Sequence, residues 1–289
     1  MKSAKFDYVK ATTVLDALAA LEDPDTKVLA GGQSLMPLLA TREVRPGRLV
    51  DLRKVSELDY VVARDDHIAI GAMTRHRTSE TSPLLAELAP LVPMAVSRVA
   101  YPTVRNQGTA GGSLAHADYR AELPSVALTL DAELVVRSSQ GERIIPASAF
   151  FLGNGETAIG PGEMLIEMRI PRSNSRYSWA MEEFTLRYRD FAIVAVYAGL
   201  DIGGDGLIES ARLTVGATDP VAVRIRAAEE FLQGKAPTSD TFIQASLLVG
   251  SFIHPEEDRF GTPDYKVKLA TVLTERALSA ATNTAGEKP

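Results

Sequence analysis

Two short glycine-containing stretches decide how this sequence is interpreted. They are Ala30-Gly31-Gly32-Gln33-Ser34-Leu35 and Thr109-Ala110-Gly111-Gly112-Ser113-Leu114, and each passes from small residues through two glycines to polar and apolar ones. The first lies between an expected strand and an expected helix start, where free N–H groups and the helix dipole favour an anion. Glycine lets a phosphate approach the backbone without meeting a Cβ. The pair therefore predicts a pyrophosphate site, with two ordinary tight turns as the alternative.

Other motifs narrow the chemistry. Neither loop has the spacing of a Rossmann dinucleotide fingerprint, and no P-loop motif occurs. The four histidines show no metal-binding spacing and no serine is marked as a nucleophile, so we assign neither a catalytic residue nor a metal ligand. His116 follows the second loop, where we expect a hydrogen-bonding or packing role. Arg105, just before that loop, is expected to bind phosphate or to form a structural ion pair.

Length, composition and net charge limit the classes of protein to which this chain can belong. With 289 residues the chain suggests two domains, and 45% hydrophobic against 24% charged residues is typical of globular proteins. Cysteine is absent, which excludes disulfides, thiolate metal sites and any flavin linked through sulfur. A formal net charge of -6 disfavours a general surface for nucleic acid or anionic membranes, though not a local basic groove.

The chain shows neither a targeting segment nor a membrane span. Basic residues at the N-terminus are not followed by an apolar region of the kind found in signal peptides. The longest smooth apolar stretch, Phe191–Leu200, is about half the length that a spanning helix requires. We therefore expect a soluble, cytoplasmic protein.

The secondary-structure pattern changes along the chain and predicts an α+β fold. Helices and strands alternate up to a polar, proline-interrupted stretch, Ile170–Arg176, where we expect a domain boundary. Three strand-like runs follow at Trp179–Leu186, Ala192–Ile202 and Leu207–Val215. Three expected helices come after them, at about 222–233, 239–250 and 264–282. Strands followed by helices indicate an antiparallel sheet with a helical layer.

Longer motifs extend the two loops into a family resemblance. Ala30–Leu35, followed by Val104–Asp118, resembles the FAD-binding medium subunit of the molybdenum hydroxylases, the family of carbon monoxide dehydrogenase and xanthine dehydrogenase. Glu183-Phe184-Thr185-Leu186-Arg187 before Asp190-Phe191-Ala192 is similar to the signature that opens this family's C-terminal domain. The resemblance covers essentially the whole chain.

The resemblance implies a fold in two parts. Residues 1–176 are expected to form an FAD-binding domain of the vanillyl-alcohol-oxidase (PCMH) type, with subdomains at about 1–57 and 58–176. Residues 177–289 are expected to form the C-terminal domain of the carbon monoxide dehydrogenase flavoprotein, a three-stranded antiparallel sheet packed on helices.

The resemblance also assigns residues to a non-covalent FAD. Ala30–Leu35 and Thr109–Ser113 would hold the pyrophosphate, and Glu122 would lie near the adenosine end. Phe191 would sit against the isoalloxazine ring, and Leu165 would touch the cofactor from the strand before the boundary. Many relatives have Ala-Gly where this chain has Tyr188-Arg189. We hypothesise that Arg189 places positive charge near the flavin and raises its potential.

The resemblance also implies a function. The chain would be the electron-transferring subunit of an oxidoreductase and would need partner subunits to oxidise a substrate. A large molybdopterin subunit would oxidise the substrate, and a small subunit with [2Fe–2S] clusters would pass electrons to FAD and on to an external acceptor, in a dimer of heterotrimers (a heterohexamer). The substrate and the acceptor stay open. Two alternatives are a self-sufficient flavin oxidase or dehydrogenase of the same superfamily and a non-catalytic binding protein with degenerate loops.

Overall fold

The computed structural model describes residues 2–172 and 177–283, which form two compact units of mixed helix and sheet. Two short segments from the N-terminal half belong to the second unit, an interleaving that the sequence pattern did not indicate. The boundary expected after residue 176 falls in residues 173–176, outside the described residues, and stays a prediction. The first unit comprises Met1–Ala89, Tyr101–Ala117 and Asp131–Pro171, and the second comprises Pro90–Ala100, Asp118–Leu130 and Arg172–Pro289.

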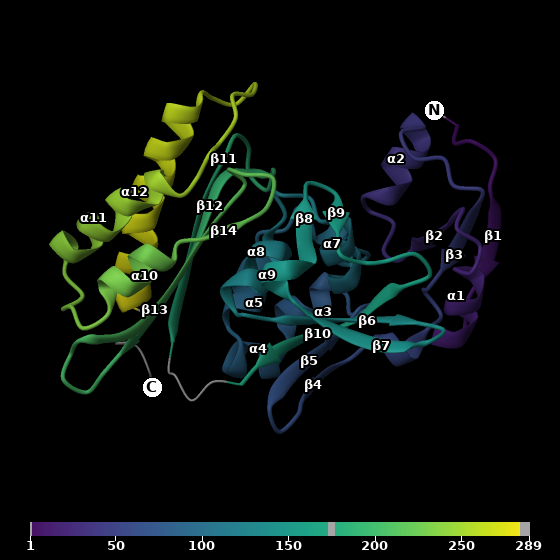
Figure 1. Ribbon diagram of the computed structural model, residues 1–289, viewed down its shortest axis with the longest axis horizontal. Coiled ribbons are helices and arrows are strands. Elements are labelled where there is room, and N and C mark those ends of the chain that lie inside the picture. Colours follow the sequence, from purple (N-terminus) through teal and green to yellow (C-terminus); the bar gives the residue numbers. More distant parts are fainter. Residues whose placement is uncertain (1, 173–176, 284–289) are drawn as a thin grey trace. The chain divides into compact units, whose positions relative to one another are not determined.

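A small parallel sheet begins the first unit (Figure 1). Its order is β1-β3-β2, from Asp7–Lys10, Arg48–Asp51 and Thr26–Leu29. Helix α1 (Val14–Ala20) follows β1, and its N-cap Thr13 forms a reciprocal capping box with Asp16. Helix α2 (Leu35–Thr41) connects β2 to β3. Because β2 ends at Leu29 and α2 begins at Leu35, the first glycine loop is the strand-to-helix turn at the carboxyl edge of this sheet.

A five-stranded antiparallel sheet forms the rest of the first unit, in the order β4-β5-β10-β6-β7. The central strand β10 carries a bulge between Leu165 and Glu167 where it pairs with β6. The strands are β4 (Val61–Ala63), β5 (His67–Gly71), β10 (Met164–Pro171), β6 (Glu133–Ser138) and β7 (Gly141–Pro146), with a separate hairpin of β8 (Phe151–Gly153) and β9 (Glu156–Thr157).

Short helices connect these strands, and their ends follow local sequence signals. Both α6 and α4 have a proline in their first turn, Pro102 and Pro83. Helix α4 is also capped by the Ser82 side chain. The helices are η1 (Ser56–Leu58), α3 (His76–Thr81), α4 (Pro83–Leu88), α6 (Pro102–Arg105), α7 (Ala110–His116) and α9 (Ala147–Phe150).

The second unit is built on an antiparallel sheet in the order β11-β12-β13-β14. Its strands are β11 (Ser178–Thr185), β12 (Ala192–Ile202), β13 (Ile208–Gly216) and β14 (Val223–Arg224). The expectation of a three-stranded sheet is corrected here, since β14 is a fourth strand. With two residues, β14 is too short to give a periodic pattern, and it lies where the sequence predicted the start of a helix.

Helices cover this sheet, and the core lies between them. In Figure 1, α10 (Arg226–Leu232), α11 (Ser239–Leu248) and α12 (Pro263–Asn283) lie on one face. Helices α5 (Leu91–Val96) and α8 (Glu122–Thr129) also belong to this unit, which a 3-10 turn, η2 (Val249–Ser251), completes. Strand β12 is buried along almost its whole length, in agreement with the apolar run of its first nine residues, 192–200.

Within residues 2–172 and 177–283, no helix is both long and apolar enough to cross a membrane.

Candidate functional site

The first glycine loop offers free backbone donors. The N–H groups of residues Gly31–Leu35 donate to no acceptor within the described ranges, although Met36 N–H donates to Gly32 O at 3.0 Å. Gly32 has a φ of +75°, in the left-handed region that glycine adopts without strain. Ser34 occupies the N-cap of α2, yet its hydroxyl makes no capping bond. The loop therefore presents a run of unpaired donors, as an anion site requires.

The second loop is built differently, because protein atoms already accept most of its N–H bonds. Ala110 donates to Thr74 O and Gly111 to Ala72 O, each at 2.9 Å, while Ser113 donates to Thr109 O at 3.0 Å. Gly112 N–H donates to the Thr109 hydroxyl at 3.1 Å, so Thr109 is a true side-chain N-cap for α7. Free N–H groups, which the sequence predicted for the first loop, are therefore present there, whereas most of those in the second loop are bonded to protein atoms.

The two loops pack directly against each other within the first unit. A Cβ placed on Gly31 would lie 2.3 Å from Gln107 O and 2.8 Å from Gly108 Cα. A Cβ on Gly112 would lie 3.5 Å from the Ala30 Cβ. Residues some eighty positions apart therefore touch through glycine backbones, and Gly31 has no room for a side chain. The structure brings the two sequence motifs together, as one shared site demands.

A layer of side chains holds the second loop from behind. Arg75 donates to Gln107 O through its guanidinium, and His76 N–H donates to Gly108 O at 2.9 Å. The His76 ring packs against Gly108, and burial, with lesser contributions from Arg105 and Arg75, lowers its pKa to about 4. His76 is therefore neutral at physiological pH. No local pattern singles out Arg75 or His76, because each contacts a segment about thirty positions further along the chain.

Arg105 is buried and forms a bidentate ion pair with Glu80. Its Nε and Nη2 donate to the two carboxylate oxygens, each at 3.0 Å. This geometry supports the structural ion pair, one of the two roles that the sequence left open. His116 is half-buried in the last turn of α7. Within the described ranges, no group of three or more His, Asp or Glu side chains is arranged to hold a metal.

Leu165 lies at the bulge in β10 and is buried. The neighbouring Ile166 accepts a hydrogen bond from Ala72 N–H, while Ala72 O accepts the one from Gly111, both at 2.9 Å. A single residue, Ala72, thus ties the second glycine loop to the bulge beside Leu165. Bulges redirect the backbone and are common beside functional sites.

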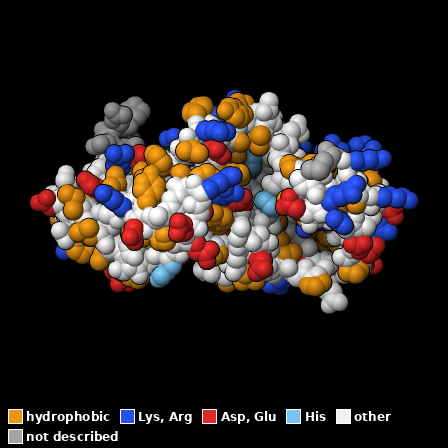
Figure 2. Space-filling view, turned by 90° about the horizontal axis from the view of Figure 1, so that it is seen from above, with side chains coloured by type: hydrophobic (Ala, Val, Ile, Leu, Met, Phe, Trp, Pro, Cys, Tyr) orange, Lys and Arg blue, Asp and Glu red, His pale blue; other side chains and the backbone are white. Residues whose placement is uncertain are grey.

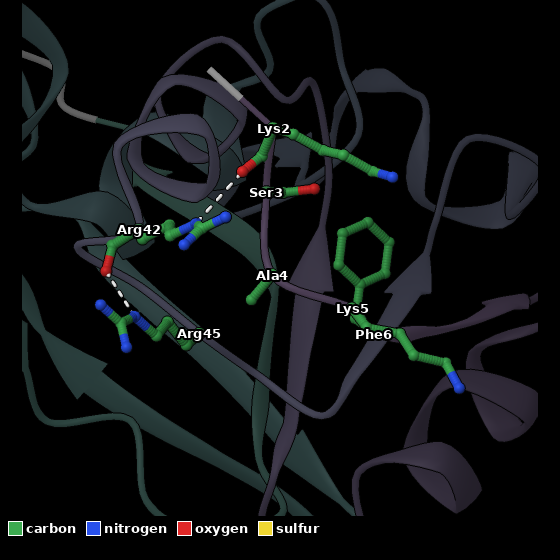
Figure 3. A pocket seen from close by; sticks show the side chains of 7 residues that line it. All are labelled: Lys2, Ser3, Ala4, Lys5, Phe6, Arg42 and Arg45. Atoms are coloured by element: carbon green, nitrogen blue, oxygen red, sulfur yellow. Dashed lines mark hydrogen bonds between the residues drawn. The ribbon is translucent and has the colours of Figure 1, made fainter.

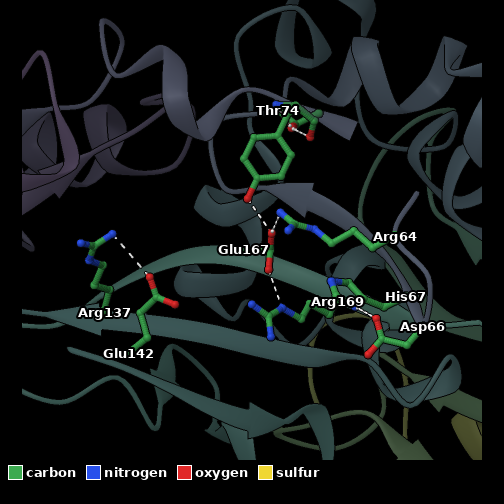
Figure 4. Close-up of polar contacts among 9 residues, drawn as sticks. Arg64, Asp66, His67, Thr74, Arg137, Glu142, Glu167 and Arg169 are labelled. Carbon is green, nitrogen blue, oxygen red and sulfur yellow. Dashed lines mark hydrogen bonds and ion pairs between the residues drawn. The ribbon is translucent and has the colours of Figure 1, made fainter. Parts of the chain in front are cut away.

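A buried carboxylate fixes the other side of the bulge (Figure 4). Glu167 accepts hydrogen bonds from Tyr60 Oη at 2.6 Å and from Arg169 Nε, and Arg64 Nη2 lies 3.4 Å away. Burial alone would raise the pKa of Glu167, but the bonds from Tyr60 and Arg169 outweigh it and hold the pKa below its usual range. Since Tyr60 and Arg64 directly flank β4, this network ties both ends of β4 to β10 beside the bulge.

In the second unit, Glu122 begins helix α8 and is half-buried. Burial raises its pKa to about 8, and the nearby charges of Glu183 and Asp118 act in the same direction. Ser125, which lies on α8 like Glu122, is hydrogen-bonded to the hydroxyl of Tyr197, a fully buried residue of β12. A carboxyl group that is neutral near pH 7 can donate a hydrogen bond to a ligand, which an ordinary carboxylate cannot do.

Phe191 precedes β12, and its ring is 48% exposed. The Arg120 guanidinium lies 4.6 Å from the ring centroid, and Arg120 Nε lies 3.4 Å from Asp118. Arg189 has a φ of +63°, in the left-handed region that glycine adopts without strain, and its Nη1 donates to Ser97 O at 2.8 Å and Ala100 O at 3.1 Å. These contacts lie within one unit and leave the effect of Arg189 on a flavin a prediction.

Comparison with known proteins matches two family models to almost the whole chain. The FAD binding domain in molybdopterin dehydrogenase matches residues 4–173. The CO dehydrogenase flavoprotein C-terminal domain matches residues 179–281.

Individual relatives are similar over their full length. The alpha subunit of the 6-hydroxypseudooxynicotine dehydrogenase complex of Paenarthrobacter nicotinovorans is 38% identical, over 97% of this chain and 96% of that one. The carbon monoxide dehydrogenase medium chain of Hydrogenophaga pseudoflava is 31% identical, over 96% and 97%. Among solved structures, quinoline 2-oxidoreductase from Pseudomonas putida 86 has a TM-score of 0.95 at 37% identity, covering 99% of this chain and 100% of that chain.

Proposed function

Since this chain belongs to the family of FAD-carrying medium subunits of the molybdenum hydroxylases, we propose that it is the FAD subunit of an oxidoreductase complex. Its task is to receive electrons from the [2Fe–2S] clusters of a small subunit and pass them to an external acceptor. A large molybdopterin subunit oxidises the substrate. The relatives support this division, because they carry the names of subunits or medium chains of dehydrogenases.

The run of unpaired N–H groups at Gly31–Leu35 is the observation that carries the proposal. A pyrophosphate needs several donors converging on one place, and this loop supplies them from the backbone. In the second loop, Gly112 lets the pyrophosphate approach the backbone closely, and the Ser113 hydroxyl offers a further polar group. The residues present therefore fit an FAD pyrophosphate, with Ala30–Leu35 as the donors and Thr109–Ser113 as the supporting wall.

We assign the remaining contacts from the family resemblance. Leu165 is proposed to touch the cofactor from β10, and Glu122 to lie near the adenosine end. Phe191 is proposed as the side chain against the isoalloxazine ring, since an exposed aromatic face is suited to stacking on a planar ring. The finer fold assignment, a PCMH-type domain followed by the flavoprotein C-terminal domain, belongs to the same proposal.

FAD supplies the one- and two-electron chemistry that amino-acid side chains lack. The chain's own residues bind and orient it. Gly31–Leu35 anchor the pyrophosphate, while Arg75, Thr109 and the Glu80–Arg105 pair keep the second loop in place. The cofactor is held without a covalent link through sulfur, because the chain has no cysteine. A cytoplasmic dimer of heterotrimers completes the proposal.

Isolation from the native host tests this function. The chain is expected to co-purify with two further subunits, and the preparation is expected to contain flavin, iron and molybdenum in fixed ratio. A solitary chain that oxidises an organic substrate with its own flavin would contradict the proposal. So would a purified chain that gains no flavin absorbance after incubation with FAD.

A further inference from the structure

A basic hollow lies in the first unit, at the end of α2 away from the glycine loop. It has a volume of about 660 Å³ and is lined by Lys2, Ser3, Ala4, Lys5, Phe6, Arg42 and Arg45. Four of these side chains are cationic and none is acidic. In Figure 2 the Lys and Arg side chains gather over the part of the unit that holds α2. In a chain with a net charge of -6, this is a local concentration of the opposite sign.

The two arginines are fixed by backbone contacts rather than by acids (Figure 3). Arg42 is the left-handed C-cap of α2, and its Nε donates to Lys2 O at 3.2 Å. Arg45 Nε donates to Arg42 O at 3.0 Å. Arg42 therefore ties the N-terminal segment to the end of α2, while Arg45 bonds back to the C-cap of the same helix. Among the described residues, the terminal nitrogens of both guanidinium groups have no acceptor, so they are available to an anion.

A second, smaller hollow provides a contrast within the same unit. It has a volume of about 290 Å³ and is lined by Lys10, Asp51, Arg53 and Lys54. There the buried Asp51 pairs with Arg53 at 2.7 Å and accepts a bond from the Tyr8 hydroxyl. The smaller hollow is thus lined by an acidic side chain that offsets part of its positive charge. At the larger one, the neighbouring Glu43 is hydrogen-bonded to Thr41 at 2.6 Å and does not line the hollow.

From this arrangement we propose that the hollow formed by Lys2, Lys5, Arg42 and Arg45 docks a carboxylate-rich segment of a partner protein. All four cations are exposed, and an exposed ion pair contributes little by itself. Useful affinity therefore requires several acidic groups bound at once, which a single small anion does not offer. Guanidinium forks match carboxylates in paired hydrogen bonds, which favours Asp or Glu side chains as the ligands.

The proposal goes beyond the function proposed above, because none of its residues belongs to the FAD site. A long polyanion such as nucleic acid is disfavoured, since a net negative chain would repel it outside the hollow. A short acidic segment would contact chiefly the four cations that line the hollow.

Fluorescence anisotropy with a labelled hexaglutamate peptide tests the proposal on the full chain. The wild-type protein is expected to bind the peptide, more weakly as salt is raised, and to ignore a hexaglutamine control. The double variant Arg42→Gln/Arg45→Gln is expected to bind about tenfold more weakly. The matched variant Lys27→Gln/Lys268→Gln, which removes two exposed charges elsewhere, is expected to bind like the wild type.

Further arms keep the test decisive. Lys2→Gln/Lys5→Gln removes charge from the other segment and is also expected to weaken binding, which guards against a local disturbance of α2. No binding by the wild type, or an equal loss in the matched variant, would overturn the proposal. Displacement of the peptide by inorganic phosphate at equal concentration would show a small-anion site instead. Tighter binding of an oligothymidylate would show a nucleic-acid site instead.

Discussion

Substitution of Gly31 by alanine is expected to weaken both FAD binding and the fold around the glycine loops. The new Cβ would lie 2.3 Å from Gln107 O, 2.8 Å from Gly108 Cα and 3.0 Å from Gln107 C. All three atoms are backbone, so no flexible side chain can move aside. The two glycine loops must therefore separate, and the pyrophosphate site widens with them.

The size of the effect follows from the cost of overpacking. Forcing one methyl group into a closely packed site costs about 1–3 kcal/mol. Because FAD requires the loops in contact, about the same free energy is lost from binding, which corresponds to a dissociation constant roughly 5- to 150-fold higher. The unfolding temperature without FAD is expected to fall by several degrees, since about 1 kcal/mol shifts it by roughly 2–4 °C at this size.

Two measurements check this prediction: titration of the apoprotein with FAD, followed by flavin fluorescence, and thermal unfolding with and without FAD. Gly204→Ala is the matched control, because a Cβ there meets nothing within 4 Å and the residue has no positive φ. The control is expected to behave as the wild type in both assays. Wild-type FAD affinity in Gly31→Ala would refute the argument that contact between the loops forms the site.

Three further predictions concern the groups around the site. Thr109→Ala removes the cap on Gly112 N–H and is expected to cost about 1 kcal/mol in chemical denaturation; Thr109→Ser keeps the hydroxyl and should retain most of it, and equal losses would contradict the cap. The Arg105 guanidinium lowers the pKa of Glu80, so this carboxylate stabilises the fold above its unfolded pKa and the effect disappears as pH falls through the folded value. Glu80→Gln should therefore lower the unfolding temperature at neutral pH and reduce the decrease of that temperature as the pH is lowered. An unchanged pH dependence would exclude stabilisation by the Glu80–Arg105 pair. Burial raises the pKa of Glu122 from 4.5 to about 8, so folding favours its protonated form and stability is lost as pH rises between these values. Glu122→Gln should then stabilise the apoprotein, increasingly from pH 4.5 to about 8, and a pH-independent difference would show that the carboxyl group titrates normally.

Local sequence patterns were sufficient to predict the glycine loops and most of the elements around them. The capped helix after Thr13 and the buried run of β12 follow from residue periodicity, which local chemistry sets. The two loops lie in contact, since a Cβ on Gly112 would lie 3.5 Å from the Ala30 Cβ, and their sharing of one pyrophosphate stays a prediction. That contact was suggested by the pairing of the motifs rather than by either loop alone.

Features that depend on distant partners could not be predicted. The N–H groups of the second loop are taken by Ala72 and Thr74, whose positions are set by the tertiary fold and by no motif. The Glu80 partner of Arg105 is 25 positions away and has no local signal. Strand β14 exists only because β13 offers it an edge, so its two residues carry no pattern of their own.

A crystal structure of the chain loaded with FAD tests the central claim most directly. The account predicts pyrophosphate oxygens within hydrogen-bonding distance of the N–H groups of Gly31–Leu35, with the second loop still closed against Gly31. A pyrophosphate bound elsewhere, with those N–H groups donating to protein atoms, would contradict it.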